Sequence, residues 1–123
     1  MENQETPLED PEESLKDLYS FFGDLDDEIS DLVEKGDEIR IEKVNAGRAI
    51  MQSFRNLEEM IGEEEYDPEF VDRTRRMADN GFSNYHEVLE NVENGLDKGY
   101  GERLERSYNH FMGLFHRIVG GEA

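Results

Sequence analysis

Three histidines, His86, His110 and His116, are the side chains of this chain that could bind a transition metal. Metal ligands on one helix must stand three or four residues apart, because only then do they share a face. His110 and His116 are six residues apart, and no histidine has a glutamate three residues before it, as the di-iron motif of helical bundles requires. The chain also has no cysteine. We therefore predict no metal site and no cofactor.

The run Asp24-Leu25-Asp26-Asp27-Glu28 has the carboxylates of the start of a calcium-binding loop. An EF-hand loop also needs glycine at its sixth position and glutamate at its twelfth. Ile29 and Lys35 occupy those positions here. The sequence therefore argues against an EF-hand, and these residues fit a helix instead.

Nucleotide binding and serine catalysis also lack their motifs. A glycine-rich turn at residues 95–101 precedes a helix whose amides could hold phosphate, but no GK[ST] sequence occurs and Glu102 would repel the anion. No serine lies in a G-x-S-x-G elbow, and Ser14 and Ser83 suit helix N-caps. We predict that the protein is not an enzyme.

The charge is the most unusual property of the composition. Asp and Glu number 32 against 13 Lys and Arg, which gives a net charge of -19 over 123 residues. Such a charge repels phosphates and anionic lipids and favours basic partners, cations and concentrated salt. Lysine is used four times and arginine nine, which together with the acidity is typical of halophilic organisms.

The distribution of the acids leaves a second interpretation open. Residues 1–65 hold 21 acids and 6 bases, whereas residues 66–123 hold 11 acids and 7 bases. Adaptation to salt alone would spread the charge more evenly, so part of it could form an acidic recognition surface. We favour salt adaptation and keep the recognition surface as the alternative.

Direct nucleic-acid binding would have to rely on arginines at residues 73–76 and in the last predicted helix, against a net charge of -19. We predict that it does not occur, because ion pairs four residues apart on helices account for several of these arginines. These pairs are Glu69 with Arg73, Asp72 with Arg76, and Glu102 with Arg106.

The converse is DNA mimicry, in which carboxylates imitate phosphates. A helix over residues 14–35 would be about 33 Å long and carry about one acid per 5 Å, whereas duplex DNA carries one charge per ~1.7 Å. The charge density of this helix alone is therefore too low to imitate DNA, and mimicry stays the alternative.

Residues 14–35 repeat apolar side chains at the 3-4 spacing of a helix that packs along one face. Phe21 and Val33 widen this face, as in a helix of a globular bundle. Gly36 followed by Asp37 predicts the end of this helix and the N-cap of the next.

Residues 37–62 predict a second helix, because apolar residues recur along them at 4-4-3-4 spacing. Two isoleucines alternate with polar residues at its start, so a strand over residues 37–44 stays open, although no second strand pattern lies nearby. Three small residues, Ala46, Gly47 and Ala49, would allow close approach of a neighbouring helix.

Three more helices complete the predicted fold. Residues 67–78 begin with an Asp-Pro pair that suits an N-cap and first helical position, and Asn80-Gly81 predicts the end of this short helix. Further apolar repeats predict helices over residues 82–96 and 104–118.

The N-terminal segment differs from the rest of the chain. Residues 1–13 contain two prolines, six acids and a single large apolar side chain, Leu8, so we expect a disordered acidic tail. Residues 14–121 then form one domain, and the predicted fold class is all-α, a bundle of four to five amphipathic helices. The chain begins without the features of a secretory signal, and its longest apolar run is far shorter than the ~20 residues of a membrane span. We expect a soluble, cytoplasmic protein that does not bind membranes.

The apolar faces of the first and last helices are the candidate binding residues. Such faces usually form the core of a monomer, but they also suit a dimer interface or a partner helix. We therefore predict a non-catalytic interaction or assembly protein, an adaptor that forms homo-oligomers or binds a basic protein partner. The alternative is an acidic inhibitor or DNA mimic that occupies a nucleic-acid-binding protein. The candidate partner-binding residues are Leu15, Leu18, Phe22, Leu25, Ile29, Leu32, Tyr108, Phe111 and Phe115.

Overall fold

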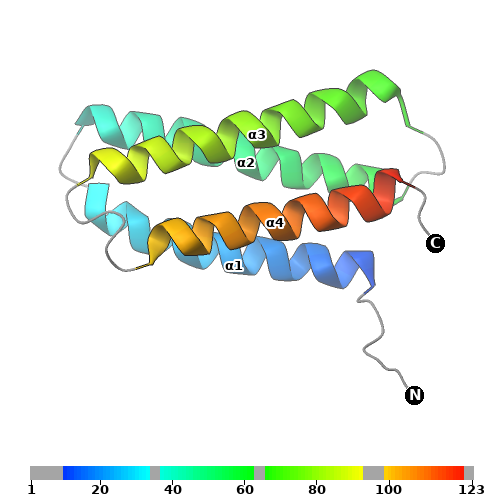
Figure 1. The fold of residues 1–123 in the computed structure, drawn as a ribbon, viewed down its shortest axis with the longest axis horizontal. Coiled ribbons are helices and arrows are strands. Elements are labelled where there is room, and N and C mark those ends of the chain that lie inside the picture. Colours follow the sequence, from blue (N-terminus) through cyan, green and yellow to red (C-terminus); the bar gives the residue numbers. More distant parts are fainter. Residues whose placement is uncertain (1–9, 34–36, 63–65, 93–98, 121–123) are drawn as a thin grey trace, which may run out of the picture.

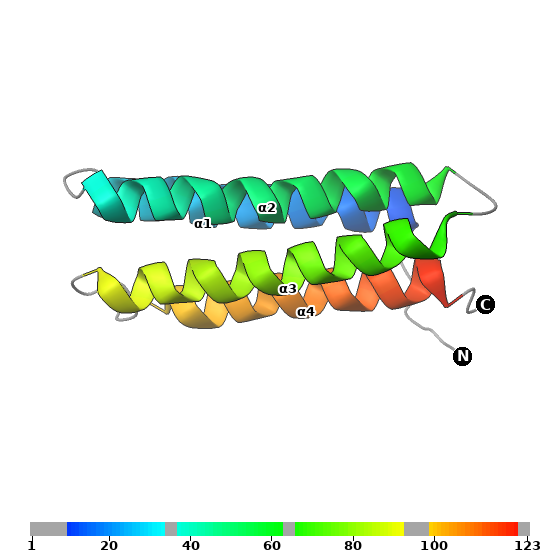
Figure 2. The same cartoon turned by 90° about the horizontal axis from the view of Figure 1, so that it is seen from above.

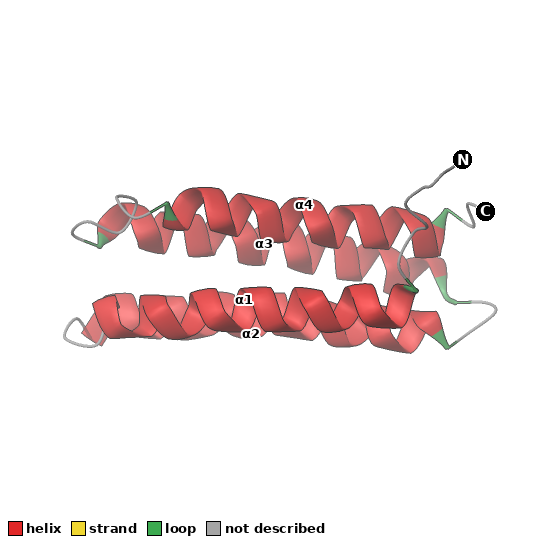
Figure 3. Cartoon of the chain, turned by 90° about the horizontal axis from the view of Figure 1, so that it is seen from below, coloured by secondary structure: helices red, strands yellow, loops and turns green. Residues whose placement is uncertain are grey.

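The computed structural model describes residues 10–33, 37–62, 66–92 and 99–120, and this part of the chain is almost entirely helical. Its elements are α1 (Pro11–Val33), α2 (Asp37–Ile61), α3 (Pro68–Asn91) and α4 (Tyr100–Val119). Consecutive helices run in opposite directions around an up-and-down bundle, in which each helix packs on its two neighbours and α2 also contacts α4 across the core (Figure 1). Figures 2 and 3 show the bundle as two layers, α1 with α2 and α3 with α4. The all-α prediction is confirmed.

The segment left open between strand and helix, residues 37–44, belongs to α2. At the start of α1 the structure corrects a boundary. The helix begins at Pro11, and the Asp10 carbonyl accepts a backbone hydrogen bond from the Ser14 amide at 2.9 Å. Proline suits the first helical position because its missing N–H would be unpaired there anyway. Residues 11–13 are therefore helical, and the rest of the predicted tail, apart from Asp10, lies outside the described residues.

The predicted break at Asn80-Gly81 is wrong, because α3 runs without interruption from Pro68 to Asn91. Gly81 is buried in the middle of this helix, where it faces α2. The glycine allows the two backbones to approach, which is a different use of the residue from ending a helix. The described residues therefore form four helices and not five, because the helix predicted over residues 82–96 is, as far as Asn91, the second half of α3.

The start of α3 has the predicted cap. Asp67 has an extended backbone conformation, and its carboxylate accepts a hydrogen bond from the Glu69 amide at 3.0 Å. Pro68 follows at the first helical position. This cap satisfies one of the amides that a helix start leaves unpaired.

The middle of the bundle is aromatic, and each helix contributes one phenylalanine to it. Phe22 of α1, Phe54 of α2, Phe82 of α3 and Phe111 of α4 are each 5% exposed or less. The ring centroids of Phe22 and Phe54 are 5.8 Å apart, and those of Phe54 and Phe111 are 6.0 Å apart. Tyr85 joins this cluster edge-on at 5.5 Å from Phe22. These contacts fix the spacing of the helices and thus the shape of their outer surfaces.

Candidate functional site

Seven of the nine residues proposed for partner binding lie in the core of the chain itself. Tyr108 is half-buried, and the side chain of Leu32 lies outside the described part. A partner could reach the buried residues only if the bundle opened, so a binding role for them stays a prediction. The proposed residues that are 4% exposed or less are Leu15, Leu18, Phe22, Leu25, Ile29, Phe111 and Phe115.

The three histidines lie at separate places. His110 Nε2 is 2.8 Å from the Ser14 hydroxyl oxygen, which joins α4 to the start of α1. His86 is exposed near Glu90, and His116 lies against the ring of Phe115. Within the described residues, no three histidine, aspartate or glutamate side chains gather to hold a metal ion.

The arginines only partly form the predicted pairs. Arg76 pairs with Asp72 at 3.1 Å, as expected. The other two predicted pairs do not form. Arg106 instead lies over the ring of Phe21, and Arg73 lies over the ring of Phe70. A pair that sequence spacing cannot reveal joins α4 to α1, where Arg103 donates two hydrogen bonds to the Glu28 carboxylate at 2.9 and 3.0 Å.

A partly buried polar cluster joins α1, α2 and α3. Lys43 Nζ lies 3.0 Å from Asp26 Oδ1 and donates to the Ser30 hydroxyl at 2.5 Å. The Tyr85 hydroxyl donates to the same carboxylate oxygen of Asp26. Burial, and then the hydrogen bond to the Asp26 carboxylate, raise the pKa of Tyr85 above its usual range. Tyr85 therefore stays protonated and acts as a hydrogen-bond donor.

This cluster was not predicted from the sequence, although one signal of it was present there. Lys43 stands three residues before Ala46 and seven before Ile50, which places a scarce lysine on the core face of α2. A buried lysine needs a charged or polar partner, so this position indicates an ion pair. The partner, Asp26, could not be identified because it stands in an acidic run with several equivalent candidates.

The candidate binding site is a groove of about 580 Å³ between α3 and α4. Its two walls come from single faces of these helices, where residues at helical spacing look toward the same hollow. The lining residues are Asp79, Phe82, Ser83 and His86 of α3, and Gly101, Glu102, Leu104, Glu105 and Tyr108 of α4.

The floor of the groove is apolar and its rim is acidic. Phe82 and Leu104 form the floor and are 5% and 3% exposed. Glu102 and Glu105 stand exposed on the rim and form no ion pair with any described residue. Two carboxylates beside an apolar floor offer a complementary surface to a side chain that is both apolar and cationic.

One end of the groove is fixed by Tyr108. Its ring packs edge-on against Phe82 with 5.3 Å between centroids, and its hydroxyl donates to Asp79 Oδ1 at 2.7 Å. This hydrogen bond, together with burial, raises the pKa of Tyr108, so the hydroxyl remains a donor. Asp79 also lies 3.9 Å from Arg75, which partly neutralises it. The unpaired negative charge therefore concentrates on the α4 side of the groove.

Within the part of the chain that the structure describes, no helix combines the length and apolar character needed to cross a membrane. The sequence matches no known family, and neither a curated protein nor a solved structure is significantly similar to the chain. The function has to be inferred from the geometry and charge of the chain itself.

Proposed function

We propose that this chain is a non-catalytic interaction protein that binds a basic segment of a protein partner in the groove between α3 and α4. The observation that supports this most directly is the pairing of a buried apolar floor with unpaired carboxylates on the rim. Lysine and arginine side chains match it, because their methylene stems pack on apolar surface while their charged ends reach carboxylates.

The net charge of the chain would assist such a partner before contact. A charge of -19 attracts basic proteins and raises their association rate at low salt. The charge alone does not choose a binding place, because exposed acids occur on every helix. The groove would supply the place, since the contacts of Phe82 and Leu104 are added there to the electrostatic attraction.

The test uses a synthetic amphipathic helix, with leucines on one face and lysines and arginines elsewhere, labelled for fluorescence anisotropy. We expect the double variant Glu102→Gln, Glu105→Gln to weaken binding about fivefold, because two exposed ion pairs of about 0.5 kcal/mol each are lost. The control is Glu42→Gln, Glu59→Gln, which removes the same charge from exposed positions of α2. Equal losses in both variants would show that only the total charge matters and would reject the groove.

The alternative, an acidic inhibitor that occupies a nucleic-acid-binding protein, is favoured by a line of exposed carboxylates on α1. Asp17, Asp24 and Asp31 are all exposed and stand seven residues apart, which places them about 10.5 Å apart along one side of the helix. For this function, the protein must displace duplex DNA from a basic DNA-binding protein. The triple Asp→Asn variant would then lose this activity, whereas the groove variant would retain it.

A further inference from the structure

The solvent side of α2 has a second repeat of side chains at 3-4-3-4 spacing, which we call the outer stripe. It lies opposite the core residues of the same helix, such as Ile50 and Leu57. Ile41 and Val44 are 61% and 37% exposed and are the exposed large hydrophobic side chains among the described residues. This spacing is typical of a helix that packs along another helix. The outer stripe consists of Ile41, Val44, Arg48, Met51 and Arg55.

The charge of this part of α2 is opposite to that of the chain. Residues 43–57 hold one lysine, two arginines and no acid, whereas 32 acids over 123 residues correspond to about four in a stretch of this length. Lys43 is already paired inside the bundle with Asp26. Arg48 is exposed and pairs with no described residue, and Arg55 donates only to the side chain of Gln52. The stripe is therefore an apolar and basic area on a strongly acidic protein.

The outer stripe also contains a hole. Val44, Gly47, Arg48 and Met51 stand at positions i, i+3, i+4 and i+7, which are the four residues that receive a side chain of the facing helix in coiled-coil packing. A pocket of about 300 Å³ opens at these residues, and it is also lined by Asp26, Lys43 and Arg55.

Gly47 gives this hole its depth. A β-carbon at position 47 would lie 3.6 Å from Asp26 Oδ1 and 3.8 Å from Tyr85 Cε2, which are ordinary contact distances. The bundle would thus accept alanine at this position, and its packing does not account for the glycine. Gly47 itself is buried, and it lines the pocket beside Asp26, where a longer side chain would take up part of the free space.

We propose that the outer stripe binds an acidic amphipathic helix of a protein partner. One apolar side chain of that helix enters the hole at Gly47, and its flanking carboxylates pair with Arg48 and Arg55. Charge complementarity determines the sign of the partner's charge, because Arg48 and Arg55 form no ion pair with any described residue, although the exposed Glu58 stands one turn after Arg55. The apolar residues between the arginines indicate that the partner segment is a helix, because their helical spacing lets them contact leucine or isoleucine side chains along one face of such a helix.

Two other occupants fit the stripe less well. A second copy placed face to face and antiparallel on the same stripe would bring Arg48 against its own symmetry mate. A nucleic acid would pair with the arginines but would gain little from Ile41, Val44 and Met51, and its charge density is repelled by the -19 body.

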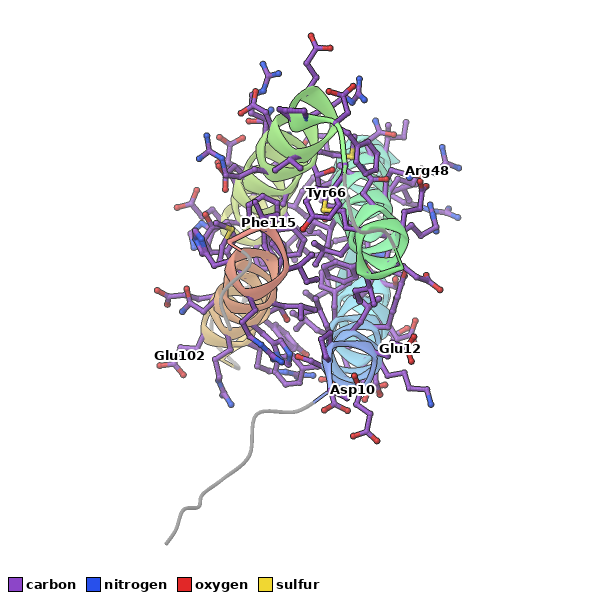
Figure 4. The ribbon with its side chains drawn as sticks, turned by 90° about the vertical axis from the view of Figure 1, so that its right-hand side faces the viewer. Asp10, Glu12, Arg48, Tyr66, Glu102 and Phe115 are labelled. Carbon is purple, nitrogen blue, oxygen red and sulfur yellow. The ribbon has the colours of Figure 1, made fainter. Side chains whose placement is uncertain are left out.

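The stripe and the α3/α4 groove lie on different sides of the molecule. Figure 4 shows Arg48 on the outside of α2 and Glu102 of the groove rim on the opposite side of the bundle, both pointing away from it. A basic and an acidic partner could therefore be held at once. The stripe proposal does not depend on the groove, because the two use different residues and opposite charges.

The test uses a synthetic helix with leucines on one face and glutamates elsewhere, measured by fluorescence anisotropy with the full chain in 0.5 M KCl. This salt concentration shortens the Debye length to about 4 Å and so screens the general repulsion between two acidic molecules. We expect Arg48→Glu to weaken binding at least tenfold. Arg73→Glu, an exposed control on α3 with the same net charge, should change it less than twofold.

Two further variants identify the kind of contact. Ile41→Gln removes the most exposed apolar side chain of the stripe and should weaken binding of the acidic helix. The same variant would leave the binding of a nucleic acid unchanged, because its phosphates would pair with the arginines alone. Gly47→Ala should also weaken binding by shrinking the hole, while the melting temperature stays level or rises, because alanine favours the helix. Absence of binding to the wild-type chain, or equal effects of Arg48→Glu and Arg73→Glu, would overturn the proposal. So would binding of labelled duplex DNA at the stripe, or a dimer in sedimentation that Arg48→Glu dissociates.

Discussion

Gly81 of α3 lies so close to Ile50 of α2 that a β-carbon on the glycine would stand 2.9 Å from Ile50 Cγ1. The same atom would be 3.2 Å from the Ile50 backbone nitrogen and from Ala49 Cβ. Ile50 is fully buried, and its branched side chain has little freedom to move aside. The glycine in the middle of α3 thus permits the close packing of α3 on α2.

Gly81→Ala should therefore destabilise the protein, although alanine forms helices better than glycine. Helix propensity alone would favour alanine by about 1 kcal/mol, whereas forcing a methyl group into a well-packed core costs about 1–3 kcal/mol. We expect the overpacking to prevail, because the methyl group would meet a backbone atom as well as side chains. Urea denaturation followed by circular dichroism measures the change in unfolding free energy.

Gly113→Ala is the matched control. Gly113 is exposed within α4, and a β-carbon there would meet nothing within 4 Å. This variant should stabilise the protein by up to about 1 kcal/mol. If Gly81→Ala were stabilising to the same degree, the close approach of α3 and α2 would be disproved.

The fold class and most helices could be predicted because periodic apolar spacing reports directly which face is buried. α1, α2 and α4 each carry such spacing along most of their length. The prediction failed at Asn80-Gly81, because this dipeptide is common in turns that end a helix, whereas here the glycine lies inside a helix and permits close packing on its neighbour. A glycine that ends a helix and one that admits a neighbouring helix look alike until Ala49 and Ile50 are placed beside it.

The candidate groove could not be predicted for a related reason. Phe82, Ser83 and His86 were assigned to a helix that begins after the predicted break at Asn80-Gly81, whereas Asp79 lies before that break, so their common face was divided. Their approach to α4 depends on how the helices pack, and the spacing of residues along the sequence does not show which helix faces pack together. The outer stripe was present in the sequence at 3-4-3-4 spacing, but the helix over residues 37–62 was predicted from its other, core-facing apolar repeat, and the alternation of Ile39 and Ile41 left a strand open over residues 37–44.

Alkaline pH should destabilise the protein through Tyr85. Burial and the Asp26 carboxylate raise the pKa of Tyr85 in the folded state above the value of about 10 that an unfolded chain has. Above that pH the unfolded state releases the proton and the folded state keeps it, so stability falls by up to about 1.4 kcal/mol per pH unit for this group. Below about pH 10 the contribution of Tyr85 to the free energy of unfolding is fully present. Urea denaturation between pH 8 and pH 11 (assay range spanning the unfolded pKa of about 10) measures it.

Tyr85→Phe isolates this effect. The variant loses a hydrogen bond to a carboxylate worth about 1.5–3 kcal/mol at neutral pH, but its stability should then fall less steeply above pH 10. Tyr19 and Tyr108, whose pKa values are also raised, would account for the slope that remains. An unchanged slope in Tyr85→Phe would mean that Tyr85 ionises freely and is not held by Asp26.

Phe22→Ala should destabilise the chain by about 3–5 kcal/mol, because Phe22 is 1% exposed and contacts aromatic rings from two other helices. Since the side chain is buried within one chain, we expect unfolding without prior dissociation of any assembly. Light scattering alongside thermal denaturation shows whether the variant unfolds directly or first dissociates from an assembly. Folded monomers released from a larger wild-type assembly would place this face of α1 at an interface between chains.

Salt should raise the melting temperature steadily between 0.05 and 2 M KCl, over which the Debye length falls from about 14 Å to about 2 Å. The net charge of -19 makes the acids repel one another more strongly in the compact state than in the unfolded chain. Changing the exposed Asp17, Asp24, Asp27 and Asp31 of α1 to asparagine would remove four charges and should flatten the rise. A melting temperature that stays level or falls with salt would disprove the repulsion and, with it, adaptation to concentrated salt. The acids would then have to be explained by recognition of a partner.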